Sequence, residues 1–458
     1  MRTILVLILF LSVACSYTPD TSVAKQLDQT VIDRLPVMMK AYGVDGMTVV
    51  AVSGQETLLS VSYGKTKDGR QFTTDTFCPV YSATKVFTSL TIASLVEEGK
   101  FDVNSTLGEQ LVDVPDDWKE IPVWRLLNHS SGITMIVNKP VFQELVENPK
   151  SGNTDIYNIV RQLPLDFNPG DHSRYRQSGY GIVEMIMADK FDVNWPALVE
   201  QHVTAPAKAT RTVYGDMHSG DRSVPLLSSA GGFQTTANDM AKIFKTLNRG
   251  EIVSLDFLEQ WLYDDTHNYD GYSLGSVLVS VDDVRTIGHS GGGRANVRFA
   301  PASEVGVMVC TDDTSNNNIM HGVADMLMRE IATDEPSLMP VQTLLHQMQG
   351  KTAAEITSSY DLAKATSRLS YDFSGAENTL NQIGYNMLDD GKVAQAIKIF
   401  RLNAREYPNS ANTYDSLGEA LLEANNLDES LQNYKKVLEL DPDNKNALEM
   451  IEKIQSLK

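Results

Sequence analysis

The stretch TFCPVYSATKVFTSLTIASLVEEG, residues 76–99, joins a short strand-like segment to an amphipathic helix that ends at Gly99. Ser82 and Lys85 stand three residues apart at the start of this helix, so their side chains share one face. A serine hydroxyl attacks a carbonyl poorly at its own pKa and needs a neighbouring base, which a lysine amine can provide. The segment predicts a serine nucleophile with a lysine base, held still by five inward-facing residues, Val86, Phe87, Leu90, Leu95 and Val96.

The spacing of Ser82 and Lys85 is a weak signal by itself, because a serine and a lysine three residues apart also recur by chance. Ser22 and Lys25 repeat the spacing just after an N-terminal apolar run, where no strand precedes them. The strand before Ser82 and the buried helix after it supply the rigid setting that a nucleophile needs. We therefore assign the nucleophile to Ser82.

Length and charge limit the classes of protein to which this chain can belong. Its 458 residues exceed one ordinary core, so we expect two domains. Apolar residues make up 42% and charged residues 21%, which is typical of globular proteins. The net charge of −20, with no basic stretch, argues against nucleic-acid binding and is interpreted as aiding solubility. The motifs of zinc sites are missing, so we expect no metal and no cofactor.

The first residues indicate export from the cytoplasm. Arg2 precedes an unbroken apolar run over 4–11, and small residues follow at 12–14, which is the pattern of a cleaved signal peptide over residues 1–14. The protein is then periplasmic or secreted. Cys15 follows the expected cleavage site and allows a second interpretation, in which the new N-terminal cysteine is lipidated and anchors the chain to a membrane. Both interpretations stay open.

Two cysteines remain in the mature chain, Cys78 and Cys310, and both lie in apolar stretches. They could pair in an oxidising compartment. Because cysteine is among the most frequently buried residues, we expect two buried free thiols instead.

The C-terminal part of the chain repeats with a period of 34 residues. This is the tetratricopeptide pattern, in which each unit is a helical hairpin that buries its apolar face only against its neighbours. It predicts an all-α domain over residues 377–458 that binds a peptide or another protein, or else braces the chain internally. The matched positions are Leu380, Ile383, Gly384, Met387, Ala396, Phe400 and Pro408, which recur as Tyr414, Leu417, Gly418, Leu421, Ser430, Tyr434 and Pro442.

Two repeats are too few for a stable array, because each end leaves an apolar face uncovered. We therefore expect a third helix pair from the irregular helical connector over residues 336–376, or docking of the repeats on the preceding domain. A terminal capping helix is expected over 446–457.

The main region, residues 22–335, mixes strands and helices. Strands from both ends of this region surround a helical middle, which predicts an α+β fold with one antiparallel sheet and a helical lobe. The site is expected in the cleft between sheet and lobe. The predicted elements are a helix at 23–41, strands at 47–52 and 57–63, helical and loop segments over 83–265, strands at 272–281, 284–288, 295–299 and 305–311, and a helix at 318–331.

Two further segments fit a serine–lysine hydrolase. Tyr175 stands at the start of a helical stretch, where its hydroxyl can relay a proton, and Gln177 can bond a substrate carbonyl with its amide. The second segment is Gly288-His289-Ser290-Gly291-Gly292-Gly293, between strands. Its glycines, Gly291 included, let a ligand approach the sheet closely, and a backbone N–H from it can join that of Ser82 in an oxyanion hole.

Rival assignments are weaker. Ser290 matches the nucleophile elbow of α/β-hydrolases, but that fold needs a helix directly after the serine and a strand is predicted here. His218 repeats the short His-Ser-Gly motif without flanking strands, and His129 is interpreted as a structural loop histidine. Gly350-Lys351-Thr352 lacks the first glycine of a phosphate-binding loop. The stretch 229–240 is interpreted as a structural turn and helix cap.

In this order, Ser82-Ala83-Thr84-Lys85, Tyr175-Arg176-Gln177 and His289-Ser290-Gly291 resemble the three motifs of the serine β-lactamase-like hydrolases. That family includes class C β-lactamases, D-alanyl-D-alanine peptidases and related esterases. The segments 124–132 and 229–240 also match, and the resemblance covers about residues 25–333. It implies a β-lactamase/transpeptidase-like fold and an acyl-enzyme route.

In the route that the resemblance implies, Ser82 attacks and Lys85 and Tyr175 manage the proton. The N–H groups of Ser82 and Gly292 hold the oxyanion. Water then releases the acyl group from Ser82.

Departures from the family pattern bear on the substrate. The lactamases usually carry a lysine at His289, and a histidine near its ordinary pKa of about 6.5 is mostly neutral at pH 7. Gln177 stands where an Asn is common, and Arg294, after the glycines, is a candidate to restore the lost positive charge. These changes favour an esterase or peptidase acting on a small molecule or peptide. The alternatives are a β-lactamase or cell-wall D-alanyl peptidase, and a catalytically inactive binding protein acting through its repeats.

Overall fold

The computed structural model describes most of the chain after residue 26. The predicted signal peptide, Cys15 and the Ser22–Lys25 pair lie outside the described residues, as does His218. Among the described residues, no helix combines the length and apolar composition needed to cross a bilayer. The described ranges are 27–137, 139–147, 152–215, 226–312, 318–333, 335–366 and 370–457.

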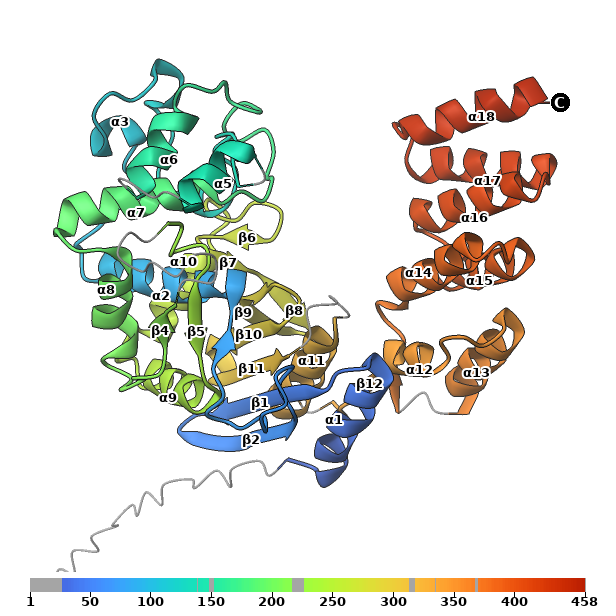
Figure 1. Cartoon of the computed structure of the whole chain (residues 1–458), viewed down its shortest axis with the longest axis horizontal. Helices are drawn as coiled ribbons and strands as arrows, with labels where there is room; N and C mark the ends of the chain where they lie inside the picture. The colour runs from blue at the N-terminus through green and yellow to red at the C-terminus, as the bar shows by residue number, and fades with distance from the viewer. Residues whose placement is uncertain are drawn as a thin grey trace, which may run out of the picture.

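The main domain is built on one six-stranded antiparallel sheet (Figure 1). Its strands come from both ends of the domain, which confirms the predicted α+β architecture. β1 pairs with β11 in register from Met47 opposite Thr311 to Ser53 opposite Val305, so segments far apart in sequence form the centre of the sheet. The strand order is β2 (Glu56–Gly64), β1 (Gly46–Ser53), β11 (Val305–Thr311), β10 (Ala295–Ala300), β9 (Val284–Gly291) and β8 (Val279–Val281).

Helices cover both faces of the sheet. Alternate residues of a strand point to opposite faces, and here both sets are apolar and buried. Val49 and Val307 pack toward α1 (Gln29–Tyr42) and α11 (Ile319–Ala332). Val50 and Met308 belong to the second core, which holds α2 (Thr84–Glu97) and α9 (Ala237–Asn248).

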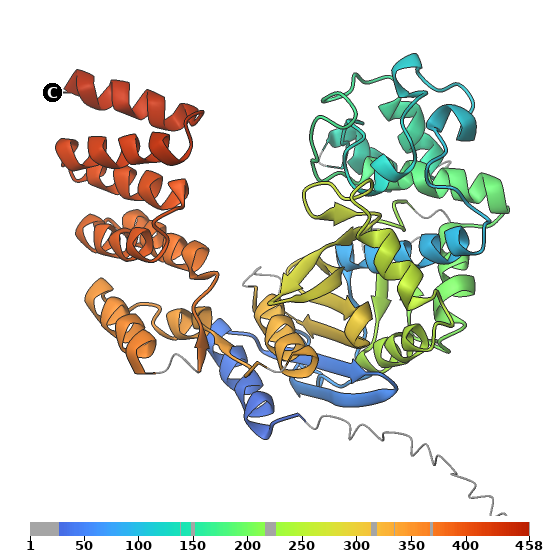
Figure 2. The same cartoon turned by 180° about the vertical axis from the view of Figure 1, so that it is seen from behind.

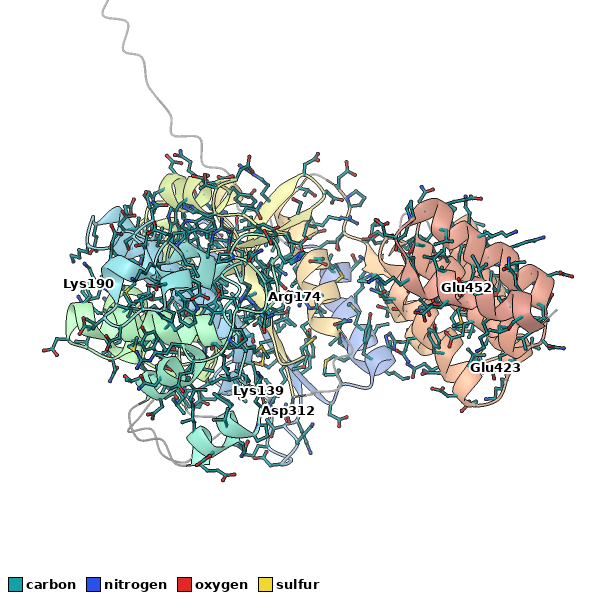
Figure 3. All side chains as sticks on the ribbon, turned by 90° about the horizontal axis from the view of Figure 1, so that it is seen from above. Lys139, Arg174, Lys190, Asp312, Glu423 and Glu452 are labelled. Atoms are coloured by element: carbon teal, nitrogen blue, oxygen red, sulfur yellow. A yellow bond between two sulfur atoms is a disulfide. The ribbon has the colours of Figure 1, made fainter. Side chains whose placement is uncertain are left out.

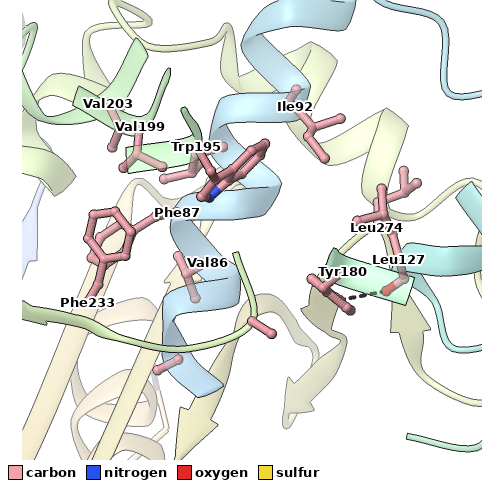
Figure 4. Packing of buried hydrophobic residues seen from close by; sticks show 14 of the residues in the cluster. Val86, Phe87, Ile92, Leu127, Tyr180, Trp195, Val199, Val203, Phe233 and Leu274 are labelled. Carbon is pink, nitrogen blue, oxygen red and sulfur yellow. Dashed lines mark hydrogen bonds between the residues drawn. The ribbon is translucent and has the colours of Figure 1, made fainter. Parts of the chain in front are cut away.

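α2, the helix that follows Ser82, is buried on all sides rather than amphipathic as predicted. Every residue from Thr84 to Leu95 is buried, because the sheet lies on one side of the helix and other helices and loops enclose the rest. Figure 4 shows Val86, Phe87 and Ile92 of α2 among side chains from several other segments of the domain. The Phe87 and Phe233 rings are 5.6 Å apart. This enclosure holds the first turn of α2 in place.

The helical middle of the domain forms a lobe above the sheet, with the start of α2 between them (Figure 1). A small sheet, β3 (Cys78–Pro79), β5 (Phe233–Thr235) and β4 (Val213–Tyr214), lies beside α2. The remaining helices are α3 (Leu107–Gln110), α4 (Trp124–Leu127), α5 (Pro140–Glu147), α6 (Asn153–Val160), α7 (Ser178–Phe191), α8 (Trp195–Val199) and α10 (Leu255–Leu262).

Three predicted elements differ from the structure. The strand expected over 272–281 is split into β6 (Tyr272–Ser273), β7 (Ser276–Val277) and β8. The break occurs because Leu274 and Gly275 have φ of 47° and 91°, which makes a turn, and the Leu274 carbonyl accepts a hydrogen bond from Ser89 Oγ (2.7 Å). β9 runs on to Gly291 instead of ending at residue 288, and α1 begins at Gln29 because Asp28 caps the Thr30 N–H.

Cys78 and Cys310 form a disulfide, and the expectation of two free thiols was wrong. Their Cα atoms are 6.4 Å apart although 232 residues separate them in sequence. The packing of two sheets decides this pairing: Cys310 lies in β11 of the central sheet, Cys78 lies in β3 of the small sheet, and both side chains are fully buried. The burial was predicted, whereas the proximity depends on the fold. The disulfide ties the segment before Ser82 to the central sheet.

The C-terminal region forms a stack of helical hairpins to one side of the main domain (Figure 2). Figure 3 shows Glu423 and Glu452 on this stack, away from the main domain. The expected third hairpin is present, because α12 and α13 share one buried core with the repeats. The helices are α12 (Val341–Gln347), α13 (Ala353–Thr366), α14 (Ala376–Asp389), α15 (Val393–Glu406), α16 (Ala411–Glu423), α17 (Leu427–Leu440) and the terminal α18 (Lys445–Leu457).

The helical stack also contacts the main domain through α1. The apolar face of the first repeat is therefore covered by the additional hairpin, and that hairpin in turn docks on the main domain. The Tyr42 and His346 rings are 4.1 Å apart, and Arg34 Nη1 donates to the Ser337 carbonyl (2.8 Å). Within the connector, the short strand β12 (Met339–Pro340) pairs in parallel with β13 (Tyr371–Asp372).

Candidate active site

Ser82 lies in a single 3-10 turn, Tyr81–Ala83, between β3 and α2. Its side chain is half-buried, so a substrate can reach it. Tyr81 has φ of 46°, which is uncommon for a non-glycine residue and marks a locally strained backbone. The amide of Ser82 stands in the first turn of the helical segment, where N–H groups lack an intrahelical acceptor.

The end of β9 packs directly against the Ser82 turn. A Cβ on Gly291 would lie 1.9 Å from the Val80 carbonyl oxygen and 2.9 Å from Ser82 N. A Cβ on Gly292 would lie 2.7 Å from the Tyr81 ring, and its φ is +55°. The glycines predicted to allow close approach are therefore needed for contact with the nucleophile turn itself. Two backbone segments thus meet at Ser82, as an oxyanion hole requires.

Lys85 lies one turn into the helical segment and is completely buried. Its Nζ donates to Tyr175 Oη (2.7 Å) and to the Ala230 carbonyl (2.8 Å). Burial lowers the pKa of Lys85 to about 7, because an ammonium is costly to remove from water. A substantial fraction of Lys85 is therefore a neutral amine, able to accept a proton, near neutral pH.

Tyr175 connects the nucleophile and the base. Burial raises the pKa of Tyr175 to about 12, and a hydrogen bond with the Ser82 side chain partly offsets that rise. The hydroxyl therefore keeps its proton near neutral pH; it accepts a hydrogen bond from Lys85 Nζ, and the Ser82 side chain is near enough to influence its pKa. The structure brings together the three residues that the sequence predicted as catalytic.

The His129 ring packs against that of Tyr175, which fits its interpretation as a structural residue. Its ring centroid is 4.5 Å from that of Tyr175 and 5.1 Å from that of Tyr272. Nδ1 of His129 lies within hydrogen-bonding distance of the backbone N (3.2 Å) and O (3.0 Å) of Arg176. Burial lowers the pKa of His129 to about 3, so it is a neutral scaffold for the Tyr175 segment.

Sequence reasoning missed two contributors, the Ala230 carbonyl and Glu184. The segment 229–240 was interpreted as structural only, yet its first turn supplies the second acceptor of Lys85. Glu184 holds that turn through bonds from Ser228 Oγ (2.7 Å) and Ser229 N (2.6 Å). One signal was visible in the sequence: Glu184 is the single charged residue in the buried stretch 178–187.

His289 and Gln177, the two candidate substrate-binding residues, each have an unused hydrogen-bonding atom. His289 Nδ1 contacts the Ser290 carbonyl (2.5 Å), while Nε2 is buried and makes no hydrogen bond to any described residue. Its ring lies 5.9 Å from that of Tyr175. Burial holds the pKa of His289 well below its ordinary value, so it is neutral. Gln177 Oε1 is likewise buried without a partner in the described part of the chain.

Arg294 is turned toward an acidic partner. Its guanidinium forms an ion pair with Asp312, and its Nε donates to the Thr311 carbonyl (3.1 Å). Figure 3 labels Asp312 on the main domain. The positive charge of Arg294 is thus neutralised within the protein.

Ser290 lies inside β9, which turns back into β10. The helix that a nucleophile elbow requires after its serine is therefore missing at this position. Gly350-Lys351-Thr352, which lacked the first glycine of a phosphate-binding loop, lies in the turn between α12 and α13. In the part of the chain that the structure describes, no group of three His, Cys, Asp or Glu residues is arranged to hold a metal ion.

Comparisons with known proteins find matches for both parts of the chain. Residues 31–327 match the sequence model of the β-lactamase family, and residues 411–444 match that of the tetratricopeptide repeat. A curated protein of Salmonella agona (strain SL483), named putative D-alanyl-D-alanine carboxypeptidase, is 23% identical over 198 residues, covering 39% of this chain and 45% of the relative. The chain thus spans less than half the length of that relative.

Solved structures share the fold at low sequence identity. A penicillin-binding protein homologue from Pyrococcus abyssi, described as octameric, has a TM-score of 0.55 and 19% identity, covering 70% of this chain and 80% of its own. The D-amino acid amidase from Ochrobactrum anthropi SV3 has a TM-score of 0.53 and 19% identity, covering 66% of this chain and 99% of its own. These likenesses establish a penicillin-binding-protein-like fold for the main domain.

Proposed function

This chain belongs to the β-lactamase family, and from that membership we propose that it is an exported serine hydrolase that opens an ester or amide bond through an acyl-enzyme on Ser82. One observation carries the proposal: a buried lysine with a pKa of about 7 donates to Tyr175, and the Ser82 side chain lies close enough to that tyrosine to lower its pKa. A nucleophile, a proton relay and a base are thus neighbours before any substrate binds.

In the proposed reaction, Ser82 Oγ attacks the substrate carbonyl and its proton passes through Tyr175 to neutral Lys85. The N–H groups of Ser82 and Gly292 stabilise the tetrahedral oxyanion. When the intermediate collapses, the bond to the leaving group breaks and the same relay returns the proton to that group. Water then adds to the Ser82 ester and releases the acid.

The charge states of two side chains, His289 and Arg294, bear on the choice of substrate. His289 is neutral and Arg294 is paired with Asp312, so neither presents a free positive charge for a substrate carboxylate. This favours a neutral ester or amide over a β-lactam. The name of the Salmonella relative and the amidase fold add support for an amide or peptide substrate. Gln177 and His289 Nε2, which have free hydrogen-bonding capacity, are proposed to hold the acyl part of the substrate.

Export and a binding role for the repeats belong to the same proposal. The Cys78–Cys310 disulfide supports an oxidising compartment, because such bonds rarely persist in a reducing cytosol. Lipidation at Cys15 would additionally anchor the protein to a membrane. The helical repeats are proposed to bind a peptide or protein.

We expect a fluorophosphonate probe to modify the purified mature protein on Ser82. Peptide mapping by mass spectrometry after labelling reads the site directly, since the probe reacts only with an activated hydroxyl. An adduct on Ser290, or no adduct, would contradict the assignment. A parallel panel of a chromogenic cephalosporin, a short-chain nitrophenyl ester and D-amino-acid amides reads the substrate class, and turnover of the cephalosporin alone would overturn the preference for an ester or amide.

Labelling should become faster as the pH rises through about 7, because only neutral Lys85 can accept the proton. Glu184, whose pKa burial raises to about 7, also titrates in this range, whereas the two histidines and the tyrosine beside Lys85 keep their protonation states. The pKa of His129 is lowered to about 3 and that of His289 lies well below its ordinary value, while that of Tyr175 is raised to about 12. Stopped-flow labelling between pH 5 and 9 measures the midpoint, and a flat profile would argue against Lys85 as the base.

A further inference from the structure

Glu184 is a buried carboxylate that the proposed mechanism does not use. It lies in the middle of α7 with 3% of its surface exposed. Its two oxygens accept three hydrogen bonds, from Ser229 N (2.6 Å), Ser228 Oγ (2.7 Å) and Asn153 Nδ2 (2.7 Å). All three donors are neutral. An ionisable group in such a place lowers the stability of the fold, because a buried charge loses its hydration.

The turn that Glu184 holds also carries the acceptors of two α2 side chains. The Ser229 carbonyl accepts from Thr88 Oγ1 (2.6 Å), and the next carbonyl, that of Ala230, accepts from Lys85 Nζ (2.8 Å). Glu184 binds the N–H of Ser229 in the same turn. A shift of this turn would therefore move the acceptor of the base.

We propose that Glu184 is a positioning residue for Lys85, which acts by clamping the 228–230 turn so that the Ala230 carbonyl stays within bonding distance of Lys85 Nζ. The inference rests on the proposed function, because it assigns Glu184 a part in proton transfer from Ser82. The contact is between protein groups only and needs no ligand.

Two observations favour a role beyond packing. Ser229 Oγ donates to the Tyr180 carbonyl (3.2 Å), so the turn is tied to α7 at a second point, one turn of α7 before Glu184. Burial raises the pKa of Glu184 to about 7. Protonation would turn one of its oxygens from an acceptor into a donor, although the three groups around the carboxylate are themselves donors. The clamp is thus strongest at the pH at which Lys85 becomes a neutral base.

Glu184→Gln tests the clamp with minimal change of shape. The new amide can still accept from Ser229 N, but its NH₂ group faces the NH₂ group of Asn153. We expect labelling of Ser82 to slow by about 10- to 100-fold on the high-pH plateau, since small displacements of catalytic groups have effects of this size. The acid limb should also move to lower pH, because an ammonium that loses an acceptor has a lower pKa.

The double variant Asn153→Asp/Glu184→Gln exchanges the two groups and restores a donor opposite an acceptor. The carboxylate introduced in place of Asn153 can accept from the new amide while still accepting from the Leu227 N–H, which Asn153 Oδ1 accepts now (3.0 Å). We expect this swap to recover most of the plateau rate and the original acid limb. Asp239→Asn is the matched control, because Asp239 is equally buried and hydrogen-bonded but its partners are Arg211, Thr212 and Lys242.

Four results would overturn the inference. One is an unchanged plateau and acid limb in folded Glu184→Gln. The second is a loss matched by Asp239→Asn, and the third is a reduced active fraction with an unshifted acid limb; both would indicate a merely structural role. The fourth is a double variant that is as slow as Glu184→Gln. If the wild-type protein is not labelled at all, the proposed function fails and this inference with it, whereas labelled wild-type protein with insensitive Glu184 variants overturns only the clamp.

Discussion

Lys85→Met is expected to slow acylation of Ser82 by about 10²- to 10⁴-fold, the usual contribution of a positioned general base. The substitution removes the amine that takes the Ser82 proton and also removes the hydrogen bond from Lys85 to the Tyr175 hydroxyl. The oxyanion hole would remain, so a small residual rate should persist. Ser82→Ala should abolish labelling altogether, because no hydroxyl is left to attack.

A loss of activity in Lys85→Met can be separated from a loss of folding. Lys85 is fully buried, and its pKa of about 7 lies below the ordinary value of 10.5, so its charge disfavours the folded state at neutral pH. An unbranched apolar chain of similar length should therefore fold at least as stably at pH 7. Lys242→Met, at a partly exposed lysine on α9, is the matched control. Equal labelling rates in wild-type protein and Lys85→Met would remove Lys85 from the mechanism.

Removing the Cys78–Cys310 disulfide is expected to lower the free energy of unfolding of the main domain by about 2–5 kcal/mol. The bond closes a loop with a sequence separation of 232 residues, so it restricts the unfolded chain strongly. Cys78→Ala/Cys310→Ala is preferable to serine, because both positions are completely buried and a hydroxyl there would need partners.

Tryptophan fluorescence during guanidinium unfolding measures this change in the main domain alone. All 4 tryptophans lie between residues 118 and 261, and the repeats contain none. Wild-type protein treated with a reductant should unfold at the same denaturant concentration as the double variant. Coincident midpoints for oxidised, reduced and double-variant protein would contradict the prediction. The labelling rate should also fall, since the bond anchors the segment that leads into Ser82.

The chemistry of the site was predictable because it depends on residue types at short spacings. Ser82 and Lys85 share one helical turn, and a helix places such residues together wherever it lies in the fold. Tyr175 was predicted from its place in an ordered set of motifs, and the structure puts its hydroxyl 2.7 Å from Lys85 Nζ. The repeats were predictable for a similar reason, since a period of 34 residues is preserved without knowledge of any distant contact.

The features that residue order alone could predict are therefore local: the nucleophile and base, the succession of strands and helices, and the helical repeats. Tertiary structure alone decided the Cys78–Cys310 bond, the enclosure of α2, the Ala230 carbonyl beside Lys85, the clamp by Glu184 and the pairing of Arg294 with Asp312. Each of these depends on sheet register, on the packing of two sheets or on loops that meet from distant parts of the chain. The spacing of residues along a sequence carries no record of such contacts, because they arise only when the chain is packed.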